Sequence, residues 1–430
     1  MLKYFVILLA VFIAGVPVAV AMGGTATLLL IMERGFAAFN PAIIAQKSCY
    51  GLNNFLLLSI PLFLFAGKIM NTGNITSRIF NFCKSLVGWL HGGLGHVNII
   101  SSVIFAGMTG TATSDAAGLG QIEIQAMRDA GYDDEFTFGI TAGSSLIGPI
   151  IPPSIPLVVY GMMTGVSIGK LLISGIVPGA MLALALGIYV EVVARRKGYP
   201  RDASFDPKKI WHDFKRSFFS LLTPVIIIGG IMSGIFTATE AAAVAAVYAT
   251  FLTTIVYKEV DLKGLKKVLW ETVRDSGSIM MVCYCASCYG YVITKSRVAL
   301  ELAEAIMTIS VNPTVICLLL VGFLLIMGCF MENLATITIM APVFYPLLVD
   351  VGFDPLAFGI IMVLTLMIGL LTPPFGMVLF VLSKVGNYPL EKMIKAALPF
   401  ILPVMVVIIM LVFFPQIITF LPNALLWIYP

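Results

Sequence analysis

Long apolar runs without a charged residue recur along the whole chain. Each exceeds the ~20 residues that a helix needs to cross a hydrocarbon core of ~30 Å. The pattern predicts an all-α polytopic membrane protein with about 11–12 transmembrane segments. The runs cover residues 4–32, 136–169, 217–239, 305–331, 355–383 and 396–430.

The first run also has features of a cleavable signal peptide. Lys3 precedes the apolar stretch, and Ala19-Val20-Ala21 offers the small residues of a cleavage site. The stretch continues to Met32, however, well past the roughly 7–15 apolar residues of a signal peptide. We therefore expect a first transmembrane helix here.

Composition and charge support this assignment. The chain is 59% hydrophobic and 11% charged, whereas soluble domains carry about 25% charged residues. Residues 195–216 contain eight Lys or Arg against three Asp, and the positive-inside rule makes this segment cytoplasmic. Topology explains this basic patch, so we do not expect nucleic-acid binding.

The two halves resemble each other at an offset of about 221 residues. Such repeats are typical of transporters, in which halves of opposite topology enclose a site at the membrane midplane. We predict inverted repeats over 1–194 and 217–430, joined by a basic cytoplasmic loop over 195–216. The matches pair Gly148-Pro149-Ile150-Ile151-Pro152-Pro153 with Gly369-Leu370-Leu371-Thr372-Pro373-Pro374, Gly131-Tyr132-Asp133 with Gly352-Phe353-Asp354, Gly107 with Gly328, and Pro178 with Pro399.

Each half contains two interruptions of its helical pattern at corresponding positions. One is polar and glycine-rich, at about 109–115 and 330–336, and the other is a Pro-Pro pair within 148–154 and 369–375. Lipid cannot hydrogen-bond free backbone groups, so such breaks occur only where protein or water surrounds them. We predict two re-entrant helical hairpins, each facing a helix broken at its prolines.

These breaks suit a site for a cation and an anion together. Proline leaves upstream carbonyls without a partner, and glycine lets backbones approach closely. Carbonyls with nearby hydroxyls would form a cage for Na⁺, while the helix that starts after each tip presents N–H groups and a positive dipole end to a carboxylate. The alternative is that the prolines are simple kinks and the hydroxyls join packed helices. The occurrence of both breaks twice and in register favours the site.

Three carboxylates lie in otherwise apolar sequence, where ionisable residues are costly and count as functional candidates. Asp115 and Glu332 fall within the predicted tips. A proton-coupled mechanism could use them, but hydroxyls and carbonyls bind sodium without protonation chemistry. Glu240 is interpreted as structural, either capping a helix or pairing with a buried base.

Two stretches, 258–275 and 68–84, mix charges with an apolar face and predict amphipathic helices at the membrane surface. They would brace a moving bundle or anchor passively at the headgroups. Cys283, Cys285 and Cys288 cluster without the paired spacing of a zinc site, so we interpret them as small buried apolar residues. The three histidines are too scattered to form a metallohydrolase site.

Seven motifs together resemble one family along nearly the full chain: the large membrane subunit of tripartite ATP-independent periplasmic (TRAP) transporters, of the dicarboxylate and sialate type. They are Met70-Asn71-Thr72-Gly73, His91-Gly92-Gly93-Leu94-Gly95, Ala126-Met127-Arg128-Asp129-Ala130-Gly131-Tyr132, Gly148-Pro149-Ile150-Ile151-Pro152-Pro153-Ser154, Thr239-Glu240-Ala241-Ala242, Met340-Ala341-Pro342 and Thr372-Pro373-Pro374.

The resemblance implies an elevator mechanism in the bacterial inner membrane, in which a transport domain holding both hairpins slides against a scaffold. It implies two partners, the small permease (Q) subunit and a periplasmic substrate-binding protein. It also implies an organic-acid substrate, sodium coupling at about two sites and no organic cofactor. The chain has no G-x-x-x-x-G-K-[ST] motif, so ATP is not expected to drive it.

The resemblance also implies residues for each site, by position. The first sodium site would use Thr109, Thr111, Gly148, Ile151 and Pro153, and the second Gly328, Met331, Glu332, Gly369 and Thr372. The substrate would contact Thr113, Ser114, Asp115, Asn333 and Thr336. Glu332 and Asn333 stand where the first tip has Thr111 and Ala112, so the two sites need not be symmetric.

The segment 118–128 looks more like the sialate branch than the C4-dicarboxylate branch. The expected function is therefore import of sialic acid or another sugar acid, with a C4-dicarboxylate importer as the alternative. Other classes remain open: a membrane enzyme, for which no catalytic dyad or metal set is evident, a channel, or a proton-coupled exporter. The repeat and paired hairpins favour alternating access.

Overall fold

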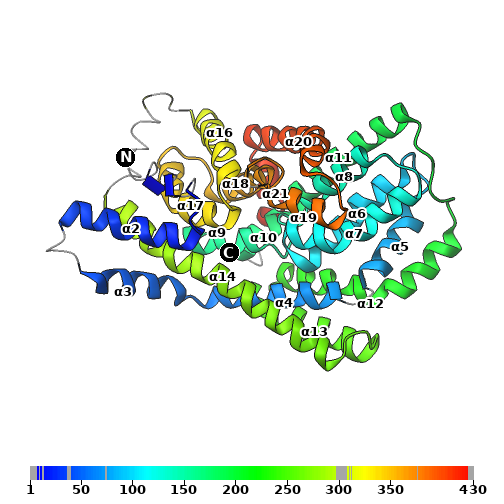
Figure 1. Cartoon of the computed structure of the whole chain (residues 1–430), viewed down its shortest axis with the longest axis horizontal. Helices are drawn as coiled ribbons and strands as arrows, with labels where there is room; N and C mark the ends of the chain where they lie inside the picture. The colour runs from blue at the N-terminus through cyan, green and yellow to red at the C-terminus, as the bar shows by residue number, and fades with distance from the viewer. Residues whose placement is uncertain are drawn as a thin grey trace.

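The chain forms an all-helical bundle in a computed structural model that describes residues 7–8, 10–11, 14–35, 40–72, 75–296, 308, 310, 312–374 and 376–424 (Figure 1). Its first-half elements are α2 (Val18–Arg34), α3 (Pro41–Leu52), η2 (Phe55–Leu58), α4 (Ser59–Thr72), α5 (Ile75–Val87), α6 (Gly93–Thr109), α7 (Ala112–Asp129), α8 (Asp134–Ser145), α9 (Ile155–Thr164), α10 (Ile168–Ser174) and α11 (Ile176–Lys197). The rest are α12 (Pro207–Met232), α13 (Ala238–Phe251), η3 (Leu252–Val256), α14 (Leu262–Lys295), α16 (Pro313–Phe330), α17 (Asn333–Asp350), α18 (Pro355–Gly369), α19 (Met377–Val385), α20 (Leu390–Phe413) and α21 (Gln416–Ala424).

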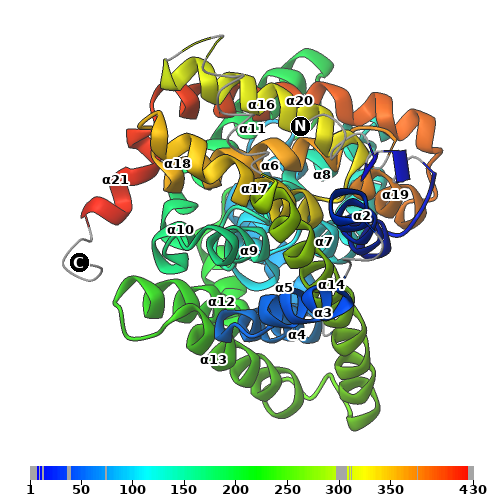
Figure 2. The ribbon, with the colours of Figure 1, turned by 90° about the vertical axis from the view of Figure 1, so that its left-hand side faces the viewer.

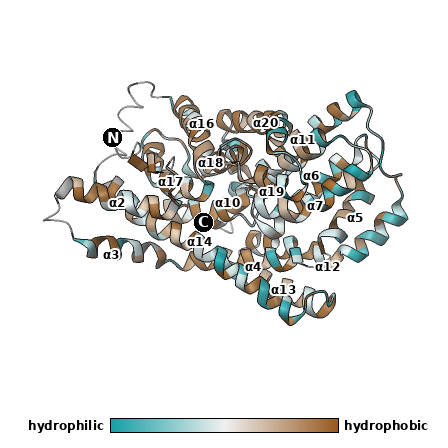
Figure 3. Cartoon of the chain, viewed as in Figure 1, coloured by the Kyte–Doolittle hydropathy of each residue, from teal (hydrophilic) through white to brown (hydrophobic). Residues whose placement is uncertain are grey.

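Within the described residues, seven helices are long and apolar enough to cross a membrane, and four shorter apolar helices accompany them. Two views at right angles place α4, α12 and α13 along one side of the molecule, and α16 and α20 along the opposite side (Figures 1 and 2). Hydrophilic residues gather at the end that carries α5 and the start of α12 (Figure 3). The protein is thus an all-helical, polytopic membrane protein.

The helix starts in the two halves follow the offset seen in the sequence. Helices α6, α7, α8 and α9 precede α16, α17, α18 and α19 by 220 to 222 residues in each case. The hairpins α6–α7 and α16–α17 each precede a helix that ends before a Pro-Pro pair, and the peptide bond between the two prolines is cis in both halves. The packing differs, however, because α6 contacts both α7 and α8, whereas α16 packs mainly against α18.

The broken helices α8 and α18 lie in the protein interior. Every residue from Phe136 to Ser145 and from Ala357 to Gly369 is buried. Close packing is possible because glycines face neighbouring helices: a Cβ on Gly139 would lie 2.4 Å from a ring carbon of Phe400 in α20, and one on Gly359 would lie 2.5 Å from Tyr160 in α9. Small residues at such contacts are the usual means of helix association in membranes.

The structure differs from the sequence expectation at the N-terminus. The apolar run over 4–32 is not one helix, because Gly15 adopts a left-handed conformation and α2 begins only after Pro17. Glycine accommodates a positive φ without steric cost, so the chain turns here. Residues 4–6, 9, 12 and 13 of that run lie outside the described residues.

Three other segments differ in extent. The segment 195–216 was expected to be a loop, but α11 continues to Lys197 and α12 begins at Pro207, with Asp206 capping its first N–H groups. The stretch 68–84 contains the end of α4 and most of α5 rather than one helix, and its residues 73 and 74 lie outside the described part. The stretch 258–275 begins with Lys258 at a positive φ, and from Leu262 on it is the first part of the 34-residue α14.

The structure explains two of the polar features singled out in the sequence. Glu240 forms a capping box with Thr237, in which each side chain bonds the other residue's backbone N–H, so its role as a helix cap is confirmed. Cys283, Cys285 and Cys288 are all buried in α14, and the Cys285 sulfur lies 3.2 Å from the position of a Cβ on Gly23 in α2. These cysteines therefore pack α14 as small apolar side chains.

Candidate functional site

The first hairpin turns within a few residues. Helix α6 ends at Thr109, Gly110 adopts a left-handed conformation, and α7 begins at Ala112. The Thr111 hydroxyl accepts the backbone N–H of Ser114 at 3.4 Å and donates to the Ser114 hydroxyl at 2.8 Å. Thr111 thus caps α7. The tip was predicted over 109–115, but in the structure it covers only 109–111, because Ala112 to Asp115 already form the first turn of the helix.

The first Pro-Pro segment lies against this tip. Helix α8 ends at Ser145, turns follow, and Ser154 caps α9 by accepting the N–H of Leu157 at 3.2 Å and donating to the carbonyl of Pro149. A Cβ on Gly110 would lie 2.3 Å from the Pro153 carbonyl oxygen, and one on Gly148 would lie 3.3 Å from the carbonyl oxygen of Thr111. At each of these two contacts a backbone carbonyl of one segment therefore lies close to a glycine of the other.

The side chains of Thr109 and Ile151, which are also expected at the first sodium site, make their contacts with helices. The Thr109 hydroxyl donates to the carbonyl of Phe105 within its own helix, and its Cα lies 3.0 Å from the position of a Cβ on Gly67 in α4. The Ile151 side chain packs against Gly179 in α11. Of the five residues, the structure brings Thr111, Gly148 and Pro153 together at the tip.

The second hairpin has the same plan with a different cap. Helix α16 ends at Phe330, Met331 and Glu332 form the turn, and α17 begins at Asn333. The Glu332 carboxylate accepts the backbone N–H of Ala335 at 3.0 Å. Glu332 lies 221 residues after Thr111, so both residues cap the helix that follows their tip.

The second Pro-Pro segment lies against the end of α16. A Cβ on Gly369 would lie 2.3 Å from the carbonyl oxygen of Gly328. The Thr372 hydroxyl is 3.3 Å from the sulfur of Cys329 and contacts the carbonyls of Ile368 and Gly369 at 3.2 and 3.3 Å. Met331 is buried. Phe375, the last residue of the predicted break, lies outside the described residues.

A cavity of about 330 Å³ lies between the two tips. Both caps line it, together with the first residues of α7 and α17, so the N-terminal ends of two helices face one space. Helix N-termini favour anions because their first N–H groups are free and the dipole is positive there. The lining residues are Leu64, Lys68, Thr111, Ala112, Thr113, Ser114, Pro149, Pro156, Asp275, Ser278, Ile279, Glu332, Asn333, Leu334, Met367, Leu370 and Met377.

Three of the five residues expected to contact the substrate line this cavity: Thr113, Ser114 and Asn333. The other two do not. Asp115 is buried and accepts a hydrogen bond at 2.8 Å from Ser102 of α6, and the buried Thr336 donates to the carbonyl of Glu332 at 3.0 Å. The reason is helical rotation, because consecutive side chains in a helix are about 100° apart and cannot all face one cavity.

Asn333 has a feature that points to a ligand. Its side chain is 4% exposed, and its Oδ1 has no hydrogen-bond partner among the described residues. The amide nitrogen lies 3.6 Å from the sulfur of Met367. A buried acceptor without a donor costs about 1–3 kcal/mol, so a ligand that donates a hydrogen bond here would recover that free energy.

Sequence reasoning did not place Lys68 and Asp275 at this cavity. Lys68 lies on α4 and Asp275 on α14, and the ammonium and carboxylate groups are 2.5 Å apart. The only sequence signal was a charged residue in the apolar stretch 55–72, which is a functional candidate by default. Asp275 lies 207 residues away, so its contact with Lys68 depends on the packing of the two helices.

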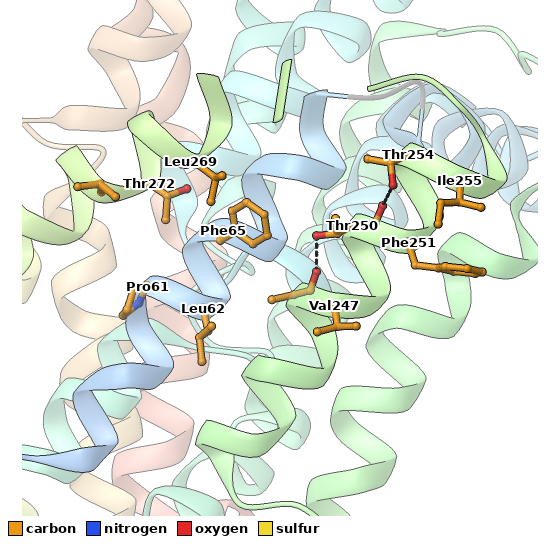
Figure 4. Close-up of a pocket in the computed structure, with 12 residues that line it drawn as sticks. Pro61, Leu62, Phe65, Val247, Thr250, Phe251, Thr254, Ile255, Leu269 and Thr272 are labelled. Carbon is orange, nitrogen blue, oxygen red and sulfur yellow. Dashed lines mark hydrogen bonds between the residues drawn. The ribbon is translucent and has the colours of Figure 1, made fainter. Parts of the chain in front are cut away.

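A second recess, of about 650 Å³, lies between α4, α13, η3 and α14 (Figure 4). Its lining is mostly apolar, with Pro61, Leu62 and Phe65 on one side. The hydroxyls of its threonines Thr250, Thr254 and Thr272 donate to backbone carbonyls one turn earlier in the chain. These hydroxyls are already bonded, so this recess lacks the polar features of the cavity between the tips.

Comparison with known proteins agrees with these features. The family described as "Tripartite ATP-independent periplasmic transporter, DctM component" matches residues 5–417. The sialic acid TRAP transporter large permease protein SiaM of Vibrio cholerae is 43% identical over 97% of both chains. The sialic acid TRAP transporter permease protein SiaT of Haemophilus influenzae is 42% identical over 97% of this chain and 67% of its own length.

Two further comparisons extend this result. The C4-dicarboxylate TRAP transporter large permease protein DctM of Pseudomonas aeruginosa is 37% identical over 95% of this chain and 94% of its own. Among solved structures, the YdaH transporter of Alcanivorax borkumensis has a TM-score of 0.62 at 14% identity over 86% of both chains, which shows a shared fold. The chain therefore belongs to the DctM family: it is a TRAP transporter large permease of the DctM/SiaM type, a multi-pass membrane transport protein and not an enzyme.

Proposed function

We propose that this permease imports an organic acid, sialic acid or another sugar acid, by symport with sodium. The observation that carries the proposal is the cavity into which both tips open, because it combines two helix N-termini, one lysine and the unpaired acceptor of Asn333. A sugar acid has a carboxylate for the positive groups and hydroxyls that donate to Asn333.

Sodium would bind where each tip meets its broken helix. On the first side the carbonyls of Thr111 and Pro153 approach the glycines of the opposite segment. On the second side the carbonyl of Gly328 and the hydroxyl of Thr372 lie beside Gly369. Carbonyl and hydroxyl oxygens suit hard cations, and two positions support coupling to about two sodium ions.

An elevator motion of two inverted repeats is the mechanism we infer. The equal spacing of the helix starts in the two halves supports the repeat. Residues of both tips line one cavity. The two hairpins and the two broken helices would therefore carry the substrate together, as one transport domain. Inverted repeats that enclose a central site are common among secondary transporters.

The relatives support sialic acid more than the alternative substrate. Two sialic acid permeases are 43% and 42% identical to this chain, and a C4-dicarboxylate permease is 37% identical. A C4-dicarboxylate importer remains the second candidate. The TRAP family implies a small permease subunit and a periplasmic binding protein, and we propose that both serve this chain at the bacterial inner membrane.

The proposal is tested by uptake into proteoliposomes that hold this permease with its small subunit. Radiolabelled sialic acid is added with and without the binding protein, and with and without an inward sodium gradient. We expect accumulation only when both are present. Accumulation of succinate instead would change the substrate and keep the mechanism, whereas sodium-independent uptake of either acid would contradict sodium symport.

Thr372→Ala tests the second sodium position. Loss of one oxygen ligand is expected to raise the sodium concentration for half-maximal uptake about tenfold, because hydrogen-bonding and ion contacts of this type contribute about 1.5 kcal/mol. Thr365→Ala is the control, since Thr365 is buried in α18, the helix that ends just before Thr372, and donates to the carbonyl of Ile361. An unchanged sodium dependence in Thr372→Ala would exclude this residue as a ligand.

A further inference from the structure

Lys68 and Asp275 form an ion pair across the wall of the cavity between the tips. The pair joins α4 to α14, with 2.5 Å between Nζ and Oδ2. The Lys68 side chain is 19% exposed and the Asp275 side chain is 40% exposed. Both residues line the cavity, so the pair can be reached by a molecule inside it.

The charges around the cavity show what Lys68 contributes. Among the described lining residues, three are charged: Lys68, Asp275 and Glu332. Glu332 is held by the N–H of Ala335 as a helix cap. An anion in this space therefore has two carboxylates and one ammonium around it, so its binding depends on Lys68.

Asp275 has a second cation available. The Nε atom of Arg274 lies 3.4 Å from its Oδ1, on the oxygen that does not face Lys68. Arg274 is 73% exposed, and Asp275 is also the more exposed partner of Lys68. If the Asp275 carboxylate left Lys68, it would still have a positive neighbour in Arg274, whereas Lys68 would need a new anion.

We propose that the carboxylate of the transported acid replaces Asp275 on Lys68. In the empty carrier the Asp275 carboxylate pairs with the Lys68 ammonium group. In the loaded carrier the substrate carboxylate pairs with Lys68, and Asp275 keeps its contact with Arg274. This inference rests on the proposed import of an organic acid and adds to it the residue that recognises the acid group. Asp275 then competes with the substrate and lowers its apparent affinity, since only the fraction of carriers with a free Lys68 can bind.

The alternative is that the pair only holds α4 against α14. The two interpretations predict different acid affinities for one variant. If Asp275 competes with the substrate, Asp275→Asn binds the acid more tightly. If the pair is only a structural link, Asp275→Asn leaves an unpaired ammonium and lowers the unfolding temperature without tighter binding.

The test measures the affinity of the purified permease complex for free acid, because a binding protein would add its own selectivity. The readout is the rise in unfolding temperature with sialic acid concentration in sodium buffer. We expect Lys68→Met to weaken binding about tenfold or more, Lys68→Arg to keep most of it, and Asp275→Asn to strengthen it about threefold or more. Wild type should prefer sialic acid to its carboxamide about tenfold, and Lys68→Met should lose that preference.

Arg78→Met is the matched control. Arg78 of α5 pairs with Glu259 at 2.8 Å and does not line the cavity. It should change the unfolding temperature of the ligand-free protein and leave the preference for the acid intact. Normal uptake by wild type, with unchanged acid affinity in Lys68→Met or unchanged or weaker affinity in Asp275→Asn, would overturn this inference alone. If wild-type vesicles accumulate neither sialic acid nor succinate, the proposed function fails as well.

Discussion

Gly369→Ala is expected to reduce sodium-driven uptake by about 100-fold or more, because displacing a positioned group by ~1 Å has effects of that size. A Cβ at this position would lie 2.3 Å from the carbonyl oxygen and 2.6 Å from the carbonyl carbon of Gly328. Both contacts are with backbone, which cannot rotate away as a side chain can. The second hairpin would have to shift from α18, and the proposed sodium position would separate.

Two other alanine variants separate this effect from a general loss of glycine. A Cβ on Gly328 would meet its nearest atom, the Cα of Gly369, at 3.5 Å, which is an ordinary contact, so Gly328→Ala should be much milder. Gly322 lies in the same helix with nothing within 4 Å of its Cβ position, and Gly322→Ala should retain near-normal uptake. The measurement is the initial uptake rate at several sodium concentrations. Equal losses in the three variants would contradict the steric explanation.

Gly110→Ala is expected to cause a comparable loss through the first hairpin. Gly110 has a φ of 65°, and a Cβ here would lie 2.3 Å from the carbonyl oxygen of Pro153. The left-handed conformation alone costs a non-glycine residue about 1–2 kcal/mol. The clash with Pro153 adds a displacement of the tip, so we expect uptake to fall and the sodium requirement to rise together.

Gly165→Ala is the matched control for this variant. Gly165 ends α9 with a φ of 78°, and nothing lies within 4 Å of its Cβ position. An alanine here is also strained by the positive φ, but its Cβ meets no other atom. The unfolding temperature should therefore fall while the sodium dependence stays normal. If Gly165→Ala and Gly110→Ala have the same sodium dependence, contact between the tip and Pro153 does not control sodium binding.

Thr111 and Glu332 cap equivalent helices in the two halves with different side chains. A Ser, Thr, Asp or Asn side chain before a helix binds the free N–H groups of its first turn. Thr111 follows this rule. Glu332 takes the same role at the equivalent position with a longer side chain, so a residue expected to bind sodium is already engaged by the helix. The offset between the halves predicted that Thr111 and Glu332 are equivalent positions. Only the fold showed that both side chains accept a backbone N–H of the helix that follows.

The N-terminal run illustrates a limit of hydrophobicity as a guide. Residues 4–32 contain no charge, yet the chain turns at Gly15 before α2 begins. Apolar composition predicts that a segment leaves water, but it does not specify whether one helix or two shorter ones do so. The conformational freedom of glycine and the fixed φ of proline decide that locally.

The sequence by itself determined the membrane class, the family, the repeat and the places where its helices break. Each of these depends on composition or on backbone effects of glycine and proline that act within a few residues. The tertiary structure decided which side chains meet: it turned Asp115 toward Ser102 and away from the cavity, and it brought Lys68 to Asp275 across 207 residues. Such contacts depend on how far each helix rotates about its axis when it packs against its neighbours, and that rotation is a property of the assembled bundle.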